Sequence, residues 1–184
     1  MVTWDEAAPP ALPQATPWQT ARGAVRVGLA LVLTAAGLAL ILPGKWLERR
    51  VSPRIRFRYA VAQLWSRAML ALMGVRLAVR GAPLREGGVL AANHASWADV
   101  LALRSTRLIN FVSKAEVRGW AGVGWIAEVC DTVFVERRRA DAPRHAAEMA
   151  ARVREGELLC VFPEGTSSDG MRVLPFKSAL LSAA

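Results

Sequence analysis

Residues 88–99 read GVLAANHASWAD, an apolar run followed by a histidine and, five residues later, an aspartate. The apolar run at 88–92 predicts a buried strand, with a helix directly after it. If both residues lay on one regular helix, their separation of five residues would place the two side chains on different faces. We therefore expect His94 in the turn before the helix and Asp99 in its first turns. There the carboxylate can fix the imidazole tautomer, which predicts a general base.

A second stretch, FPEGTSS at 162–168, follows another apolar run and predicts a tight turn after a buried strand. Pro163 and Gly165 force this turn, so the backbone N–H groups of Gly165 and Thr166 can point at an anion or a carbonyl oxygen. Glu164 can bind a substrate hydroxyl. Taken alone, the stretch would be an ordinary loop with a surface glutamate.

Together the two stretches resemble the signatures of the glycerolipid acyltransferase family, of the lysophosphatidate acyltransferase type. Asn93, His94 and Asp99 match its first signature, which is Asn-His, four residues and then Asp. Residues 162–167 match its later signature, Phe-Pro-Glu-Gly-Thr-Ser, without a substitution. The resemblance extends from about residue 77 to the end of the chain.

The resemblance implies roles for these residues. His94 would take the proton of a substrate hydroxyl that attacks an acyl thioester, with Asp99 as its partner; each alone could be a core histidine or a helix-start acid. The residues implied to recognise the acyl acceptor are Glu164, Gly165 and Thr166. Asn93 and Ser96 are expected either to support the turn as caps or turn formers, or to contact the substrate directly.

Direct transfer from acyl-CoA or acyl carrier protein is implied, with no covalent enzyme intermediate, metal or resident cofactor. Ser96 stands near His94 but is not expected to be a nucleophile. The oxyanion is expected to bind backbone amides of the His94 turn or basic side chains.

Residues 133–139, VFVERRR, fit the family's middle block. Arg137 stands where the family binds the acceptor's phosphate, a task that suits a guanidinium. Arg138 and Arg139 are expected to form a basic face near anionic headgroups. The expected acceptor is 1-acylglycerol 3-phosphate, giving phosphatidate in phospholipid biosynthesis. Residues 167–177, SSDGMRVLPFK, also resemble members that acylate lyso-ornithine lipids, which lack that phosphate.

The composition of the 184 residues favours a membrane protein with an anionic partner. Apolar residues make up 53%, and the 24 Lys and Arg exceed the 15 Asp and Glu. Because no basic stripe with interleaved aromatics is present, we favour membrane lipid and expect no nucleic acid. Cys130 and Cys160 lie in apolar contexts and predict buried thiols.

The first part of the chain predicts a membrane anchor. Residues 1–20 contain four prolines and are expected to be a disordered lead-in, followed by an anchoring region at 21–75. Residues 27–44 carry no charge and are just long enough to cross a bilayer. Because the more basic flank follows them, the catalytic part should face the cytoplasm at the inner membrane. A half-inserted helix is the alternative, and a cleaved signal peptide is disfavoured.

Residues 57–75 predict an amphipathic helix that lies on lipid or packs on the catalytic domain. Beyond it, apolar runs alternate between strands at 77–80, 89–92, 108–112, 132–135 and 157–162 and helices at 97–105, 118–128 and 140–154. This alternation predicts an α/β fold, a mixed sheet flanked by helices, in an acyltransferase domain at 76–184. His145 is expected to be exposed on the last of these helices.

The family's last signature, an apolar strand with prolines, does not occur before Ala184. We therefore expect the C-terminal part of the family fold to be missing, with an exposed sheet edge after the start of a helix at 174–180. The alternative to an enzyme is a catalytically inactive, truncated membrane-binding remnant.

Overall fold

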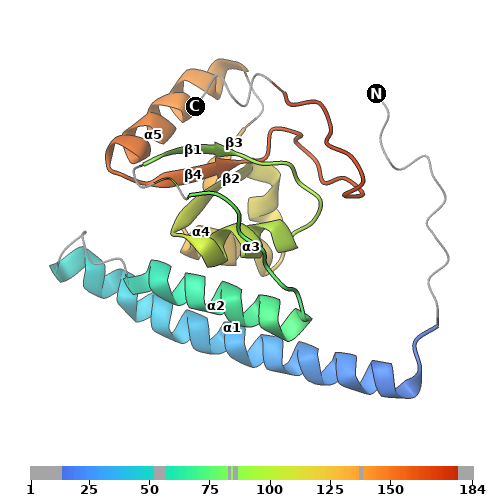
Figure 1. The fold of residues 1–184 in the computed structure, drawn as a ribbon. Helices are drawn as coiled ribbons and strands as arrows, with labels where there is room; N and C mark the ends of the chain where they lie inside the picture. Colours follow the sequence, from blue (N-terminus) through green and yellow to red (C-terminus); the bar gives the residue numbers. More distant parts are fainter. Residues whose placement is uncertain (1–13, 52–56, 83, 85–86, 137–138, 178–184) are drawn as a thin grey trace.

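A parallel sheet forms the middle layer of the α/β part of the molecule, with helices on both faces (Figure 1). The computed structural model describes residues 14–51, 57–82, 84, 87–136 and 139–177. The described strands are β1 (Gly88–Ala91), β2 (Ile109–Lys114), β3 (Val133–Val135) and β4 (Leu158–Val161). Their order in the sheet is β1-β4-β2-β3.

The described helices connect these strands or precede them. They are α1 (Pro17–Val51), α2 (Phe57–Met73), α3 (Ala98–Thr106), α4 (Val123–Val129) and α5 (Ala142–Arg154), with short 3-10 helices η2 (Ala115–Gly119) and η3 (Arg139–Asp141). The predicted α/β class with flanking helices is confirmed. Every described strand pair is parallel, whereas a mixed sheet was expected, because a helix returns the chain between successive strands.

The central strand β4 is buried on both faces, which explains its continuous apolar sequence. Leu158 and Cys160 pack with residues of α3 on one face. Leu159 and Val161 pack with residues of α5 on the other face. This alternation follows from the two-residue period of a strand and places α3 and α5 on opposite sides of the sheet.

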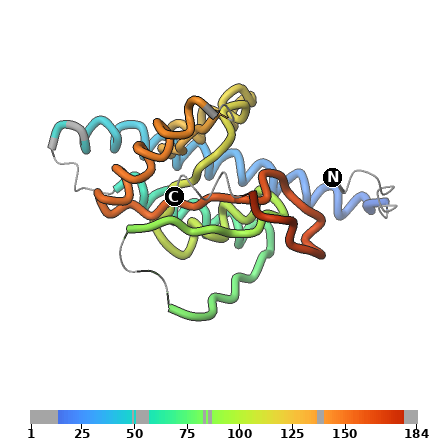
Figure 2. Tube along the Cα trace, turned by 90° about the horizontal axis from the view of Figure 1, so that it is seen from above, coloured from blue at the N-terminus to red at the C-terminus, as the bar shows by residue number. Residues whose placement is uncertain are grey.

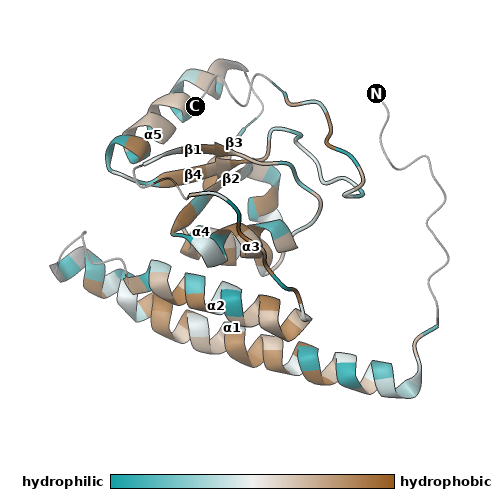
Figure 3. Cartoon of the chain, viewed as in Figure 1, coloured by the Kyte–Doolittle hydropathy of each residue, from teal (hydrophilic) through white to brown (hydrophobic). Residues whose placement is uncertain are grey.

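The helices α1 and α2, called the anchor pair below, lie side by side under α3 and α4 (Figure 1). α1 has 35 residues and so extends over about 52 Å. It is the one helix in the described part of the chain that is long and apolar enough to cross a membrane, by length and composition. Its apolar surface is largely exposed in this structure (Figure 3).

α2 packs on the α/β domain, one of its two predicted placements. Met69 and Leu70 contact Leu101 of α3. At the other end of α3, the Ser105 carbonyl accepts hydrogen bonds from Arg67 Nε at 2.8 Å and Gln63 Nε2 at 3.3 Å. α2 therefore holds α3 through both apolar and polar contacts.

Two predicted elements differ from the structure because of glycines and the sheet's limited extent. The helix expected at 118–128 is divided: η2 ends at Gly119, and Gly122 has φ 74°, so α4 starts only at Val123. A left-handed residue ends regular helix geometry. Residues 77–80 pair with no strand in the described part of the chain, so the predicted first strand was wrong.

Two further predictions were wrong. Residues 174–177 are not helical, because Pro175 removes a backbone donor and restricts the residue before it, while 178–180 lie outside the described residues. His145 is buried, not exposed, since its face of α5 covers the sheet. Its Nε2 accepts a hydrogen bond from the Glu136 N–H at 3.2 Å. Of the lead-in expected at 1–20, residues 1–13 lie outside the described residues, and the prediction was wrong for 17–20, because α1 begins at Pro17.

Packing of α5 on the sheet predicts a large effect of Met149→Ala. Met149 is 1% exposed and lies in the cluster formed with Val133 and Leu159. Removing this side chain should lower the free energy of unfolding by about 2–5 kcal/mol, because the cavity collapses only in part. Met171, at 87% exposed, provides the control: Met171→Ala should change stability by less than about 0.5 kcal/mol. The measurement is the thermal unfolding midpoint of each variant in detergent, followed by tryptophan fluorescence. Equal midpoints for Met149→Ala and Met171→Ala would contradict the packing of α5 on the sheet.

Candidate active site

The two sequence motifs meet because their strands are neighbours. β1 pairs with β4 in parallel, with Ala91 opposite Val161, so the following residues leave the sheet at one edge (Figure 2). The Ser168 N–H donates to the His94 carbonyl at 2.8 Å. The His94 N–H donates to Glu164 Oε1 at 3.3 Å. Both backbone polar groups of His94 are thus bonded to the second motif.

One oxygen of Asp99 fixes the turn that carries His94. Asp99 Oδ2 lies 3.0 Å from His94 Nδ1 and accepts the N–H groups of Ala95 at 2.7 Å and Ser96 at 2.9 Å. Ser96 Oγ accepts the Ala98 N–H at 3.1 Å and so supports the turn before α3, although the N-cap residue of this helix is Trp97. An ionised carboxylate only accepts, so Nδ1 carries the proton and Nε2 keeps its lone pair. That tautomer can act as a general base.

An aromatic ring supports one face of the imidazole. The rings of His94 and Phe162 are stacked with centroids 4.1 Å apart and planes 21° apart. Phe111 stacks next to Phe162 at 6.0 Å, and Arg104 Cζ lies 5.3 Å from the Phe111 centroid. Since Asp99 holds one edge of the imidazole and Phe162 one face, both the direction and the plane of the ring are set.

Glu164 lies between the motifs and not on the surface of the site. It is 1% exposed, and its Oε2 is buried with no hydrogen-bond partner among the residues that the structure describes. A carboxylate in such surroundings is costly unless it is bonded. Its described contact, with the His94 N–H, is therefore structural, and the predicted bond to a substrate hydroxyl stays a prediction.

The second motif forms the predicted tight turn, but the backbone N–H of Gly165 does not point outward as predicted. Gly165 has φ 69°, and its N–H donates to the Phe162 carbonyl at 3.0 Å instead of pointing at an anion. The positive φ favours glycine at this position; a Cβ would also lie 2.8 Å from Lys177 Nζ, but the end of that flexible side chain can move away. Thr166 is exposed beside it. Its predicted contact with the acceptor stays a prediction.

Three backbone amides of the His94 turn are already bonded within the protein. The N–H groups of His94, Ala95 and Ser96 already donate to the carboxylates of Glu164 and Asp99. Stabilisation of the oxyanion, by other backbone amides or by basic side chains, stays a prediction.

Among the residues that it describes, the structure gives no partner role to the remaining candidates. Arg137 and Arg138 lie outside the described residues, and the Asn93 side chain is exposed. Burial raises the pKa of the Cys160 thiol to about 12, so it stays protonated and is no nucleophile. Cys130 is only half-buried, in contrast to the prediction.

The comparisons with known proteins agree with this geometry. The family model described as Acyltransferase matches residues 76–184. The chain belongs to the acyltransferase family. It is 38% identical over 174 residues to a lyso-ornithine lipid O-acyltransferase of Rhodobacter capsulatus, covering 93% of this chain and 63% of the relative. It is 37% identical over 129 residues to a 1-acyl-sn-glycerol-3-phosphate acyltransferase of Neisseria meningitidis, covering 68% and 50%.

The fold also occurs in a solved structure of the family. The 1-acyl-sn-glycerophosphate (LPA) acyltransferase PlsC from Thermotoga maritima superposes with a TM-score of 0.61 and 23% identity, covering 89% of this chain and 70% of that one. At this identity the likeness supports the fold. The chain spans about three fifths of the length of the first curated relatives it matches.

Two contributions to the site were missed at the level of sequence. The sequence motif gives Phe162 no role of its own, although an aromatic residue directly after a central strand is placed to contact the neighbouring turn. Ser168 bonds the His94 carbonyl through its backbone, and because any residue but proline has such a donor, no sequence signal identifies it.

Stacking on Phe162 predicts a loss of turnover in Phe162→Leu. Leucine fills most of the volume but has no ring face, so the imidazole plane is less fixed. Because a stacked pair contributes about 0.5–1.5 kcal/mol, kcat should fall by roughly two- to tenfold with KM unchanged. Phe111→Leu, one ring further from His94 in the same core cluster, should lower stability similarly but leave kcat nearly unchanged. Equal kcat values for the two variants would contradict the stacking role.

Proposed function

We propose that this chain transfers an acyl group from a thioester donor to the free hydroxyl of a lysolipid at a membrane. The observation that carries the proposal is the contact between His94 Nδ1 and Asp99 Oδ2, held next to the second family motif. His94 is 22% exposed, so the imidazole can meet a substrate from outside. The family match supports acyl transfer as the reaction class.

The steps of the proposed reaction follow from the His94 tautomer in which Nδ1 carries the proton and Nε2 is free to accept one. The lysolipid hydroxyl oxygen attacks the thioester carbonyl carbon while His94 Nε2 takes the hydroxyl proton, and Asp99 stabilises the imidazolium. The tetrahedral oxyanion collapses, the C–S bond breaks, and the thiolate takes the proton back from His94. The products are the diacylated lipid and a free thiol. We propose acyl-CoA or acyl carrier protein as donor, with no resident cofactor.

For the acceptor we propose a lyso-ornithine lipid first and 1-acylglycerol 3-phosphate second. The relatives named lyso-ornithine lipid O-acyltransferase match 84–93% of this chain, while those named for 1-acylglycerol 3-phosphate match 68–72%. Residues 167–177 favour the same choice. Arg137 favours the second acceptor, which would place the enzyme in phosphatidate synthesis.

We propose that α1 anchors the enzyme in the inner membrane with the α/β domain on the cytoplasmic side. Exposed apolar side chains along α1, among them Val25, Leu31 and Val32, support membrane contact. Lys45 and the arginines that follow it support the orientation, since basic residues favour the cytoplasmic side.

Loss of the general base should abolish transfer. In His94→Ala, thiol release in membranes with a lysolipid and acyl-CoA should fall by ~10²–10⁴-fold. Asp99→Asn should also reduce release strongly, because it disturbs the tautomer. Asp141→Asn is the matched control: Asp141 also stands at a helix start, before α5, so a mere helix-dipole role would affect both variants alike. Equal thiol release by His94→Ala and the unaltered chain would instead identify a non-catalytic membrane protein.

Arg137→Gln separates the two acceptors. With a lyso-ornithine lipid, which lacks the phosphate, we expect the highest turnover and a change of less than about twofold on substitution. Product formation from a panel of lysolipids checks this. Highest turnover with 1-acylglycerol 3-phosphate, together with a steep rise in its apparent KM in Arg137→Gln, would reverse the order of the acceptors.

A further inference from the structure

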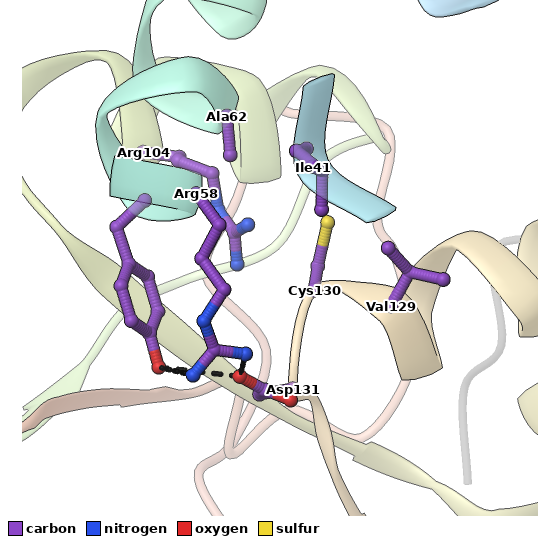
Figure 4. A pocket seen from close by; sticks show the side chains of 8 residues that line it. Ile41, Arg58, Ala62, Arg104, Val129, Cys130 and Asp131 are labelled. Atoms are coloured by element: carbon purple, nitrogen blue, oxygen red, sulfur yellow. Dashed lines mark hydrogen bonds and ion pairs between the residues drawn. The ribbon is translucent and has the colours of Figure 1, made fainter. Parts of the chain in front are cut away.

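Asp131, which follows α4, contacts both helices of the anchor pair. Its carboxylate accepts hydrogen bonds from Lys45 Nζ at 3.0 Å and from Arg58 Nη1, and the Tyr59 hydroxyl lies 3.3 Å from Oδ2. Lys45 belongs to α1, and Arg58 and Tyr59 belong to α2. Figure 4 shows Arg58 and Asp131 facing each other where the anchor pair meets the α/β domain.

A second carboxylate balances the charges. Glu48 of α1 is buried; its Oε2 lies 2.6 Å from Arg58 Nε, and its Oε1 accepts the Arg58 N–H at 3.1 Å. The side chains of Arg58 and Asp131 are each 18% exposed, and that of Lys45 is 27% exposed. Because these charges are largely withdrawn from water, removing one leaves the others poorly compensated.

Asp131 is itself fixed in the α/β domain. Its φ of 56° is left-handed, a conformation that aspartate and asparagine tolerate better than most residues. Its carbonyl accepts a hydrogen bond from Arg152 Nη1 of α5 at 2.9 Å. The Asp131 carboxylate is therefore held in a fixed position on the α/β domain, facing the anchor pair.

Directional bonds of α2 to the α/β domain also come from Arg67 and Gln63, which donate to the Ser105 carbonyl, and from Asn110, which donates to the Tyr59 hydroxyl. The contacts directly beside the charges are apolar and do not set direction. Ile41 of α1, Ala62 of α2 and Val129 of α4 form a small buried cluster beside the charges (Figure 4). Apolar burial stabilises the junction in proportion to area, but it is non-directional. At this point the hydrogen-bonded charges provide the direction.

We propose that the cluster of Asp131, Arg58, Lys45 and Glu48 fixes the angle between the anchor pair and the α/β domain, and so holds His94 at the depth of a bilayer lysolipid's hydroxyl. These are positioning residues, since none touches the reacting atoms. The inference rests on the proposed function. It predicts that the cluster matters for acceptors embedded in a bilayer and not for acceptors free in water.

Asp131→Asn tests this, because asparagine keeps the shape and tolerates the left-handed backbone but lacks the charge. Turnover is measured with a long-chain lysolipid in phosphatidylethanolamine–phosphatidylglycerol vesicles and with a short-chain analogue that is monomeric in water. We expect kcat/KM to fall by roughly tenfold or more for the vesicle acceptor, since small misplacements are costly, and to stay within about twofold for the monomeric one.

Two further variants make the result specific. Glu128→Gln removes an ion pair of α4 with Arg118, 2.8 Å long and exposed at both ends, and should leave the ratio of the two activities unchanged. Lys45→Gln retains the contact between Arg58 and Asp131 and should change the ratio in the same direction but less. It also provides the test if Asp131→Asn does not fold, as judged by its thermal midpoint.

Equal losses on both acceptors would show a general structural role and overturn the inference. An unchanged ratio in both Asp131→Asn and Lys45→Gln would overturn it as well. A different result, no acyl transfer to either acceptor by the unaltered chain, would refute the proposed function and this inference together.

Discussion

Parallel pairing of β1 with β4 brings two turns, 70 residues apart at His94 and Glu164, to one edge of the sheet. The pairing alone gives proximity. Geometry comes from two carboxylates, since Asp99 binds the imidazole and two amides of its turn, while Glu164 binds the His94 N–H. An acyltransferase of this kind needs an imidazole in one tautomer and one plane. The edge of this sheet provides both.

The contact of His94 with Asp99 could be predicted because it is local: five residues across a strand-to-helix junction leave few alternatives. The burial of Glu164 could not be predicted in this way, because it depends on which strand lies beside β1. A single sequence motif does not determine the order of strands in a sheet. The burial of His145, by contrast, was open to prediction. His145, Met149 and Val153 are four residues apart, so the period of α5 places them on the one face that covers the sheet.

Carboxylates hold segments that are distant in sequence at both important junctions of this molecule. Glu164 joins the two turns of the site, and Asp131 joins the anchor pair to the α/β domain. Each is buried enough that a missing partner would be costly. Apolar contacts accompany both, but they tolerate sliding. At both junctions, hydrogen bonds to the carboxylate therefore set the relative orientation of the two segments, while the apolar clusters add stability without setting it.

α3 links these two junctions physically. Its first turn carries Asp99, and its C-terminal carbonyl at Ser105 accepts hydrogen bonds from Arg67 and Gln63 of α2. With only nine residues, about 13 Å, a helix of this length behaves as a rigid rod. A rotation of the anchor pair would therefore move the carboxylate that orients His94. Under the proposed function, the position of the anchor pair in a bilayer and the alignment of the His94 imidazole would therefore depend on the same helix, α3.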